Sequence, residues 1–357
     1  MIENISAVSK GLAKHKKMNE NIANEIKPLV ERISSCYGSR LLAIAVMGAA
    51  ARGEETWLNG KMVSDVDLAL ITRRFDPFFP AKLKAVTDRY FGSIPFRIDV
   101  GCIPLRNLRN HRSKEYYEAR ETAHILWGDK DIFRYVPIKR PEEIPQWEGV
   151  RLLFNRAFDL LQAFYGGDNP EYCIAKTYLA IGEAYLVFEG RYRCSYKERL
   201  EEIRPGCELE AVEHFTDKFE RATHFKLGQS SEVALPPNEA KQDLLQALEH
   251  FLAIYTESEG TLEQNIDVLS RKFYHPYHAL TYSLTRLKKR EFRIRSLFEE
   301  PCFTIWKEII SLLRAPSPQT RFEEISERFW QTPQFLETDS SLERALFKLN
   351  GIRRWLA

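Results

Sequence analysis

The chain has 357 residues, 44% of them hydrophobic, and its 52 basic and 50 acidic side chains leave a net charge of +2. This composition predicts a soluble globular protein, because the apolar content supports a sizeable core and no stretch reaches the roughly twenty apolar residues of a membrane helix. The near-neutral total excludes no class of partner, because local excesses of charge matter more for binding.

The first residues and the cysteines bear on the location of the protein. Residues 1–22 are polar and basic and contain no apolar signal core, which favours a cytoplasmic protein. The six cysteines are scattered without a C-x-x-C pair and indicate neither a zinc site nor a disulfide framework. We therefore expect reduced thiols and no membrane partner.

The first predicted elements are a helix and a strand. Residues 18–36 place apolar side chains at three- and four-residue spacing, which predicts an amphipathic helix packed against a sheet. Residues 41–47 are an apolar run that predicts a strand ending at Gly48. Three alanines then leave room for a bulky group to approach the backbone, before Arg52. A turn of this kind suits a phosphate.

A second strand carries a pair of acids. Apolar and other residues alternate over 65–71, so Asp65 and Asp67 lie on one face of the predicted strand, two residues apart. Two adjacent carboxylates repel each other unless a cation lies between them. A hard divalent ion such as Mg²⁺, carrying the phosphates of a nucleotide, is the natural partner.

A third acid completes this pattern. Residues 96–100 predict a further strand, and its pairing beside strand 65–71 brings Asp99 next to the other two aspartates, around one or two metal ions. Residues 80–91 predict the crossover helix, 113–123 another helix, and 123–129 a closing strand. Taken singly, each feature has an ordinary explanation, such as solvated aspartates on an exposed strand.

Taken together and in this order, these motifs resemble the nucleotidyltransferase superfamily, which includes DNA polymerase β, kanamycin nucleotidyltransferase and the minimal nucleotidyltransferases. The resemblance covers residues 40–130. It implies an α+β fold in which a small mixed-sheet core is followed by an all-helical C-terminal domain. It departs from the family pattern in two places. The usual Gly-Ser is Gly48-Ala49, which removes a hydroxyl that commonly touches the triphosphate, and the link from Gly53 to Asp65 is longer than in minimal members.

The resemblance also implies an activity and roles for residues. The activity is transfer of a nucleoside monophosphate from an NTP to an acceptor hydroxyl, with Mg²⁺ or Mn²⁺ and release of pyrophosphate. Asp65 and Asp67 would hold the metal that clamps the phosphates, and Asp99 would bind a second metal and help to deprotonate the acceptor. Gly48 and Ala49 would offer backbone N–H groups to phosphate, with Arg52 as a cationic neighbour.

The rest of the chain reads as helical. We expect a core domain over 1–135, a proline-containing surface linker over 136–149, and an all-helical domain over 150–357, with the active site in the cleft between the domains. After the first two helices, split by residues 166–170, the sequence predicts helices at 208–226, 239–257, 262–290, 301–314, 320–329 and 341–355.

Two further features bear on binding. By resemblance to poly(A) polymerases and oligoadenylate synthases, Lys176 is a candidate for the triphosphate, and Ser195 and Tyr196 lie in a loop suited to a base or phosphate. The ordinary alternative is that Ser195 caps the next helix. Residues 271–295 hold eight basic residues and one acid with interleaved aromatics, a pattern typical of either an RNA-binding segment or a helix with a solvated charged face.

Three functions stay open on these grounds. The first is the nucleotidyltransferase, whose acceptor is a small molecule, a protein or an RNA. The second is a nucleotide-binding pseudoenzyme or regulatory protein, suggested by Ala49. The third is a nucleotidylating factor of the toxin or antitoxin type that acts on protein or tRNA, for which residues 271–295 are the only hint. The sequence does not choose the NTP, the acceptor or the oligomeric state.

Overall fold

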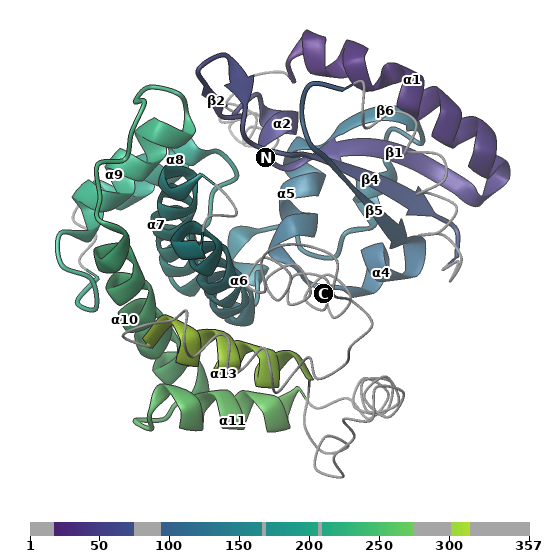
Figure 1. Cartoon of the computed structure of the whole chain (residues 1–357). Helices are drawn as coiled ribbons and strands as arrows, with labels where there is room; N and C mark the ends of the chain where they lie inside the picture. The colour runs from purple at the N-terminus through teal and green to yellow at the C-terminus, as the bar shows by residue number, and fades with distance from the viewer. Residues whose placement is uncertain (1–17, 75–93, 166–168, 206–208, 274–300, 315–357) are drawn as a thin grey trace, which may run out of the picture. The chain divides into compact units, whose positions relative to one another are not determined.

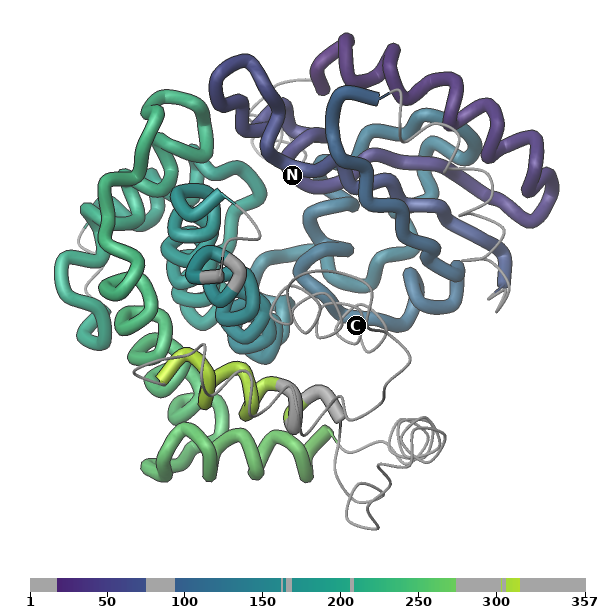
Figure 2. Tube along the Cα trace, viewed as in Figure 1, coloured from purple at the N-terminus to yellow at the C-terminus, as the bar shows by residue number. Residues whose placement is uncertain are grey.

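The computed structural model describes residues 18–74, 94–165, 169–205, 209–273 and 301–314 (Figures 1 and 2). The chain divides into two compact units. The first unit comprises Met1–Pro145, Gly190–Glu202 and His224–Ser231, and the second comprises Gln146–Glu189, Ile203–Thr223 and Glu232–Ala357. The first unit thus includes two short segments that the predicted division assigned to the helical domain.

The first unit is built on a mixed four-stranded sheet. Its strands are β1 (Leu41–Met47), β4 (Val66–Thr72), β5 (Ile98–Pro104) and β6 (His124–Gly128), in the order β5-β4-β1-β6. Strand β1 pairs antiparallel with β4 and with β6, whereas β4 and β5 are parallel. This confirms the predicted small mixed sheet. The predicted crossover helix at 80–91 lies outside the described residues.

Helix α1 (Glu20–Tyr37) covers one face of this sheet and confirms the predicted amphipathic helix. It begins after Asn19, whose side chain accepts a hydrogen bond from the N–H of Asn21. The face beneath α1 is formed by alternate residues of the strands, and these share a buried apolar cluster with the helix: Ile44, Val46, Val66, Leu68, Leu70 and Ile98. Burial of this cluster supplies the main driving force for the sheet to pack.

Short helices lie on the other side of the sheet. Figure 1 shows α4 (Leu105–Asn110) and α5 (Lys114–Thr122) there, opposite α1. Helix α2 (Gly48–Arg52) follows β1 directly and ends at Gly53, which adopts the left-handed conformation that favours glycine. The long link to Asp65 contains a hairpin of β2 (Trp57–Leu58) and β3 (Lys61–Met62).

Most of the surface linker predicted over 136–149 belongs to the first unit, whose first segment ends at Pro145, and it packs there with residues 130–135 before it. Residues 130–145 contain two 3₁₀ turns, Ile132–Tyr135 and Pro141–Glu143, and pack several apolar side chains into the first unit. The buried residues are Ile132, Phe133, Val136, Ile138 and Ile144. The prolines at 137, 141 and 145 suggested a linker, but the apolar residues before and between them outweigh the proline signal because their burial is favourable.

Every regular element that the structure describes in the second unit is a helix. Its helices are α6 (Gln146–Tyr165), α7 (Pro170–Phe188), α9 (Phe215–Lys226), α10 (Pro237–Thr256), α11 (Leu262–Lys272) and α13 (Pro301–Arg314), and α8 (Tyr196–Ile203) falls mostly in the first unit. Helix α7 is buried along most of its length, as expected for a central helix that is apolar all round. The rings of Phe154 and Trp306 stack with centroids 4.3 Å apart.

Two predicted helices have different bounds in the structure. The helix predicted over 208–226 begins at Phe215, because the residues just before it form turns. Within the helix predicted over 262–290, which allowed a break at Pro276, the structure describes α11, and this helix ends at Lys272 with Phe273 as its C-cap. Residues 274–290 lie outside the described residues. The helices predicted at 320–329 and 341–355 lie outside the described residues. None of the helices that the structure describes is long and apolar enough to span a membrane.

Candidate functional site

Three carboxylates meet at the edge of the sheet in the first unit. Asp65, Asp67 and Asp99 each offer an oxygen, and these oxygens all lie within 4.8 Å of one another. We call them the carboxylate cluster. The parallel register pairs Asp67 with Asp99 directly, as predicted from the sequence. Because alternate residues of a strand face opposite sides, Asp67 and Asp99 lie on the face away from α1.

The carboxylate cluster suits a hard divalent cation. Asp67 is exposed and the other two aspartates are half-buried, so their oxygens are accessible at the end of the strands. Oxygen-only donors from several carboxylates are the ligands that Mg²⁺ and Mn²⁺ prefer. The donor set therefore fits such an ion. Arg97, a neighbour on the same face, approaches both oxygens of Asp99 at 3.4 Å.

Gly48 stands directly against this cluster. It adopts φ +65°, and a Cβ atom at this position would lie 2.7 Å from Oδ2 of Asp67. Contacts of that length do not occur between such atoms, so the close approach of the turn to Asp67 requires glycine. Strand pairing explains the arrangement, because Met47 at the end of β1 pairs with Asp67. The sequence-predicted turn and carboxylates are thus brought together.

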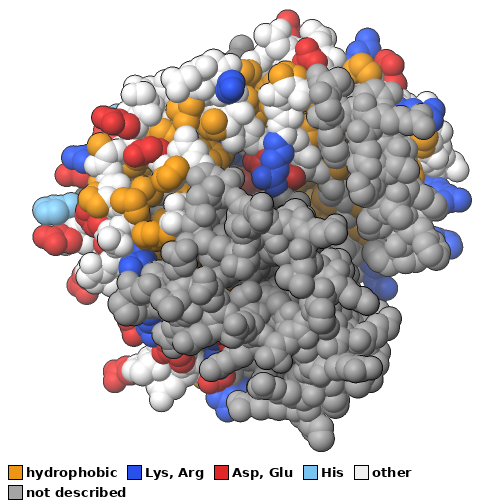
Figure 3. Space-filling model, in the orientation of Figure 1, with side chains coloured by type: hydrophobic (Ala, Val, Ile, Leu, Met, Phe, Trp, Pro, Cys, Tyr) orange, Lys and Arg blue, Asp and Glu red, His pale blue; other side chains and the backbone are white. Residues whose placement is uncertain are grey.

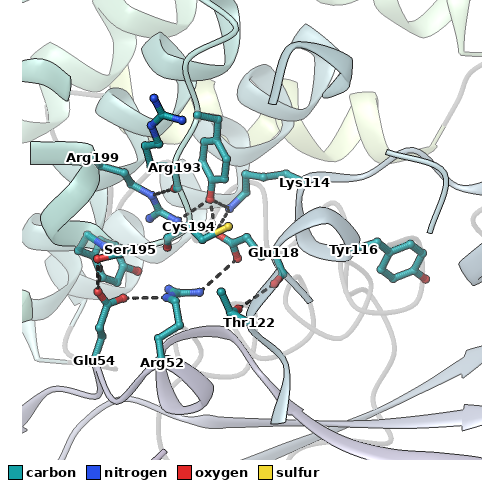
Figure 4. A network of polar contacts seen from close by, with 12 residues as sticks. Arg52, Glu54, Lys114, Tyr116, Glu118, Thr122, Arg193, Cys194, Ser195 and Arg199 are labelled. Atoms are coloured by element: carbon teal, nitrogen blue, oxygen red, sulfur yellow. Dashed lines mark hydrogen bonds and ion pairs between the residues drawn. The ribbon is translucent and has the colours of Figure 1, made fainter. Parts of the chain in front are cut away.

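Arg52 points into a buried network. Its side chain is 3% exposed, and its Nε donates to Oε2 of Glu54 at 2.7 Å, while Nη1 lies 3.7 Å from Oε2 of Glu118. Burial lowers the pKa of Arg52, but the Glu118 and Glu54 carboxylates outweigh this and raise the pKa above its usual value. Figure 4 shows Arg52 between the two glutamates. Its predicted role beside a nucleotide phosphate stays a prediction.

Ser195 and Tyr196 contact the same glutamate from the other side. The other oxygen of Glu54, Oε1, accepts hydrogen bonds from Ser195 Oγ at 2.8 Å and from the Tyr196 N–H at 3.1 Å. These residues begin α8, and the N–H of Ser195 donates to Glu198 within that helix. The alternative that Ser195 caps α8 stays a prediction, because its Oγ donates to Glu54, while carboxylate oxygens of Glu54 and Glu198 accept from the N–H groups at the start of this helix.

The buried network extends to residues that the sequence did not single out. Glu118 accepts hydrogen bonds from Tyr192 Oη and, at 2.5 Å, from Arg199, whose side chain is 1% exposed, and its Oε1 lies 3.6 Å from the Lys114 ammonium. We call Arg52, Glu54, Lys114, Glu118, Tyr192 and Arg199 the ion-pair network. These residues are dispersed over more than a hundred positions, so no local pattern marks them.

The ion-pair network shifts the protonation of its members. Burial alone would raise the pKa of Glu118, but Lys114, Arg52 and Arg199 together lower it to about 2. Burial also raises the pKa of the Cys194 thiol to about 12. Glu118 is therefore ionised and Cys194 is a neutral thiol at neutral pH. Neither has the pKa of a general base that works near pH 7, so we assign this network a structural role.

Lys176 lies in the second unit, on α7. Its ammonium stands 4.5 Å from the centre of the Tyr172 ring, one turn earlier on the helix. Such a contact is typical of a cation–π pair within one helix, here with the buried ring of Tyr172. The predicted role of Lys176 with a triphosphate stays a prediction.

The basic stretch 271–295 is described only at its start. The ring of Phe273 lies 4.5 Å from that of Trp147, and the Lys272 ammonium lies 4.2 Å from the centre of the Tyr255 ring. Phe273 is therefore part of an aromatic cluster in the second unit, which favours the packing alternative for this residue. The rest of the stretch lies outside the described residues.

No protein-family model matches the chain, and no curated protein matches it in sequence. Among solved structures it is similar to the crystal structure of spectinomycin adenyltransferase AAD(9) from Enterococcus faecialis with ATP and spectinomycin. The TM-score is 0.43 with 12% sequence identity, and the match covers 63% of this chain and 97% of the other. The likeness is one of backbone arrangement at low identity.

Proposed function

We propose that this protein is a metal-dependent nucleotidyltransferase that moves a nucleoside monophosphate from an NTP to an acceptor hydroxyl. The observation that carries the proposal is the carboxylate cluster, whose oxygens lie within 4.8 Å of one another beside a glycine turn. Neither the three acids nor the glycine turn would support this proposal without the other. Their convergence matches the chemistry of phosphoryl transfer, which depends on positioning and on stabilisation of charge.

Asp65 and Asp67 hold the divalent cation in this proposal. Asp67 is the second residue of β4 and Asp65 directly precedes the strand, so the strand pairing fixes the backbone of both residues at its accessible end. The bound ion supplies charge stabilisation to the phosphates. Gly48 keeps the turn close to Asp67 and, with Ala49, offers backbone N–H groups to phosphate oxygens.

Asp99 acts on the acceptor. One oxygen of its carboxylate accepts the proton of the acceptor hydroxyl as that oxygen forms a bond to the α-phosphorus. The bond between the α-phosphorus and the bridging oxygen breaks, and pyrophosphate leaves with the electron pair. The proton then passes from Asp99 to solvent. The position of Asp99 across from Asp67 in the parallel register supports this division of roles.

The alternative on the same fold is a nucleotide-binding protein without turnover. The observation that favours it is Ala49, because the hydroxyl of the usual serine is missing from the turn. Such a protein would bind NTP and metal at the carboxylate cluster and release no pyrophosphate. A factor that modifies protein or tRNA was suggested only by the basic stretch 271–295. The described residues add no observation in favour of that function.

A labelled-nucleotide screen tests the proposal. The protein is incubated with each α-labelled NTP, with Mg²⁺ or Mn²⁺, and with a cell extract separated into small molecules, RNA and protein. We expect label to enter one fraction with release of pyrophosphate. The double variant Asp65→Asn/Asp67→Asn should lose metal-dependent NTP binding, whereas Asp131→Asn, at a side chain 82% exposed in the same unit, should keep it.

Two results would count against the proposal. NTP binding without transfer to any fraction would favour the binding protein. Metal-dependent NTP binding that survives in the double variant would remove the carboxylate cluster from the site altogether.

A further inference from the structure

A basic surface in the first unit is separate from the carboxylate cluster. It is formed by α4 with the residues that follow it, and by the 3₁₀ turn Ile132–Tyr135, which contacts α4. Four arginines on these elements have exposed side chains: Arg106, Arg109, Arg112 and Arg134. We call them the arginine surface. The stretch 105–112, LRNLRNHR, contains three of them and no acid, so positive charge is concentrated in this short segment.

The arginine surface lies at the far end of β5 from Asp99. That aspartate is the second residue of β5, and α4 begins directly after the strand ends at Pro104 (Figure 1). At about 3.3 Å per residue, the start of α4 is roughly 20 Å from Asp99. The arginine surface is therefore distinct from the proposed metal site.

Tyr135 holds two of the arginines in place. The guanidinium carbon of Arg109 lies 4.4 Å from the centre of the Tyr135 ring, and that of Arg134 lies 4.7 Å from the same centre. Nη2 of Arg134 also donates to Tyr135 Oη at 3.1 Å. Because these contacts restrict two long side chains, less conformational entropy is lost when a ligand binds them. The two guanidiniums at one ring also repel each other, and a bound anion lowers that repulsion.

Few acids balance these charges. Nη2 of Arg134 lies 3.3 Å from Oδ2 of Asp129, and its Nη1 lies 4.0 Å from Oδ2 of Asp131. None of the other three arginines forms an ion pair with any of the residues that the structure describes. The arginine surface therefore carries an excess of positive charge and attracts a partner with several negative charges.

The side chains indicate the chemistry of this partner. All four cations are arginines, whose planar guanidinium donates two parallel hydrogen bonds to a phosphate. Arg106 and Arg109 are three residues apart and so are neighbours on α4, which suits phosphates that repeat along a chain. The large apolar residues Leu108, Ile132 and Phe133 are buried, whereas a helix that binds a membrane surface needs an exposed apolar face. These features favour a nucleic-acid strand over a lipid surface.

We propose that the arginine surface binds a single-stranded nucleic acid through its phosphate backbone. Arg106, Arg109 and Arg112 donate to phosphate oxygens, and Arg134 adds positive charge beside Arg109 at the shared ring of Tyr135. Contacts to phosphate do not read the bases, so RNA and DNA strands of any sequence bind. Binding requires neither an NTP nor a metal ion, so the proposal is independent of nucleotidyl transfer.

Fluorescence anisotropy tests the proposal with a labelled oligouridylate of about 12 nucleotides and the matching oligodeoxythymidylate. NTP is omitted, and EDTA removes divalent metal ions. We expect saturable binding of both strands, with an association constant that falls linearly with salt concentration on logarithmic scales. The triple variant Arg106→Gln/Arg109→Gln/Arg112→Gln should weaken binding about tenfold or more. It should also reduce the salt slope by about 2, because each phosphate contact to a single strand contributes about 0.7.

A matched variant controls for the change in net charge. Lys27→Gln/Arg32→Gln/Lys61→Gln removes three positive charges from exposed side chains of the same unit, on α1 and β3. It should leave the affinity within about twofold and the salt slope unchanged, because these side chains are not part of the arginine surface and exposed charges are screened by salt. Circular dichroism and thermal melting would confirm that both variants are folded.

The absence of saturable binding to either strand would overturn the proposal. So would equal affinity and salt slope in the wild type and the arginine variant, which would place nucleic-acid binding elsewhere on the chain. An equal loss in the control variant would indicate attraction to net charge alone. Sedimentation with phosphatidylserine vesicles that depends on the same arginines, without binding of either strand, would assign the surface to a membrane instead.

Discussion

The carboxylate cluster and the ion-pair network lie in the same unit but differ in how their charges are arranged. The cluster brings three acids together at the accessible end of two strands. The network surrounds the buried Glu118 with Lys114, Arg52 and Arg199, so charges of opposite sign lie next to each other. Figure 3 shows one face of the molecule, on which the acidic and basic side chains of the described residues are interspersed. The three adjacent acids of the carboxylate cluster differ from this mixed pattern.

The two arrangements of charge have different consequences for binding and for stability. Like charges held close together near solvent are costly unless a cation joins them, so the fold retains them for binding. Opposite charges held together in the interior stabilise only as a complete set, because removal of one partner leaves another charge buried and uncompensated. Substitutions in the cluster should therefore affect binding and rate, and substitutions in the network should affect folding.

The largest expected effect on stability comes from Glu118→Gln. The change leaves Arg52, Lys114 and Arg199 buried without their common partner, and we expect the free energy of unfolding to fall by about 3 kcal/mol. Urea unfolding measures this difference. Glu121→Gln on the same helix breaks a partly exposed pair with Arg120 and should cost less than about 1 kcal/mol. Equal losses in the two variants would contradict the distinction.

The same glutamate should govern stability in acid. The pKa of Glu118 is lowered to about 2 in the folded chain, against about 4.3 in an unfolded one, so its contribution is complete above the unfolded value. That contribution is lost as the pH falls from about 4.5 towards 2. Glu118→Gln should therefore show a shallower loss of stability across this window than the wild type, measured by urea unfolding at each pH.

An intermediate effect is expected from Gly48→Ala. Gly48 faces Asp67 of the carboxylate cluster and begins α2, the helix that carries Arg52 of the ion-pair network. The added Cβ would meet Asp67 Oδ2 at 2.7 Å at a positive φ, so we expect about 2 kcal/mol of destabilisation together with weaker Mn²⁺ binding. Gly38→Ala is the matched control, because Gly38 also has a positive φ but faces open space. Its variant should lose some stability and keep its Mn²⁺ affinity, measured by calorimetry.

The smallest expected effect is a gain. Ala49→Ser restores a hydroxyl in the turn after β1, and one net hydrogen bond to phosphate should tighten NTP binding by about 1 kcal/mol without affecting the fold. Equilibrium dialysis with labelled NTP measures it. Weaker binding in a folded variant would show that the turn does not face the triphosphate.

Sequence reasoning reached the carboxylate cluster because local periodicity encodes it. The alternation of residues along 65–71 predicts that Asp65 and Asp67 share one face of the strand. Asp99 joins them once strand β5 pairs with β4 in the observed register. The network could not be reached in this way, because Glu118 and Arg199 are 81 positions apart and meet only through tertiary packing. Arg52 is the clearest example. The sequence shows that it follows the glycine turn, but it does not show that its side chain is buried against Glu118.

The same limit applies to the unit boundaries. The apolar side chains of 130–145 carried a packing signal that the proline content masked. Segments 190–202 and 224–231 join the first unit through contacts that are distant in sequence. Thr56 Oγ1, for example, donates to the backbone oxygen of Lys226 at 3.0 Å. Hydrogen bonds of this kind leave no periodic trace in a sequence.

In the proposed reaction, Asp99 serves the chemical step and not only the binding of nucleotide. The direct measurement compares NTP affinity and pyrophosphate release in the wild type, Asp99→Asn and the control Asp131→Asn, with the acceptor fraction that supports transfer. We predict that Asp99→Asn lowers the rate by on the order of 10²-fold or more and changes NTP affinity far less, because the amide keeps its size but cannot accept the proton. Wild-type turnover in Asp99→Asn would contradict the account.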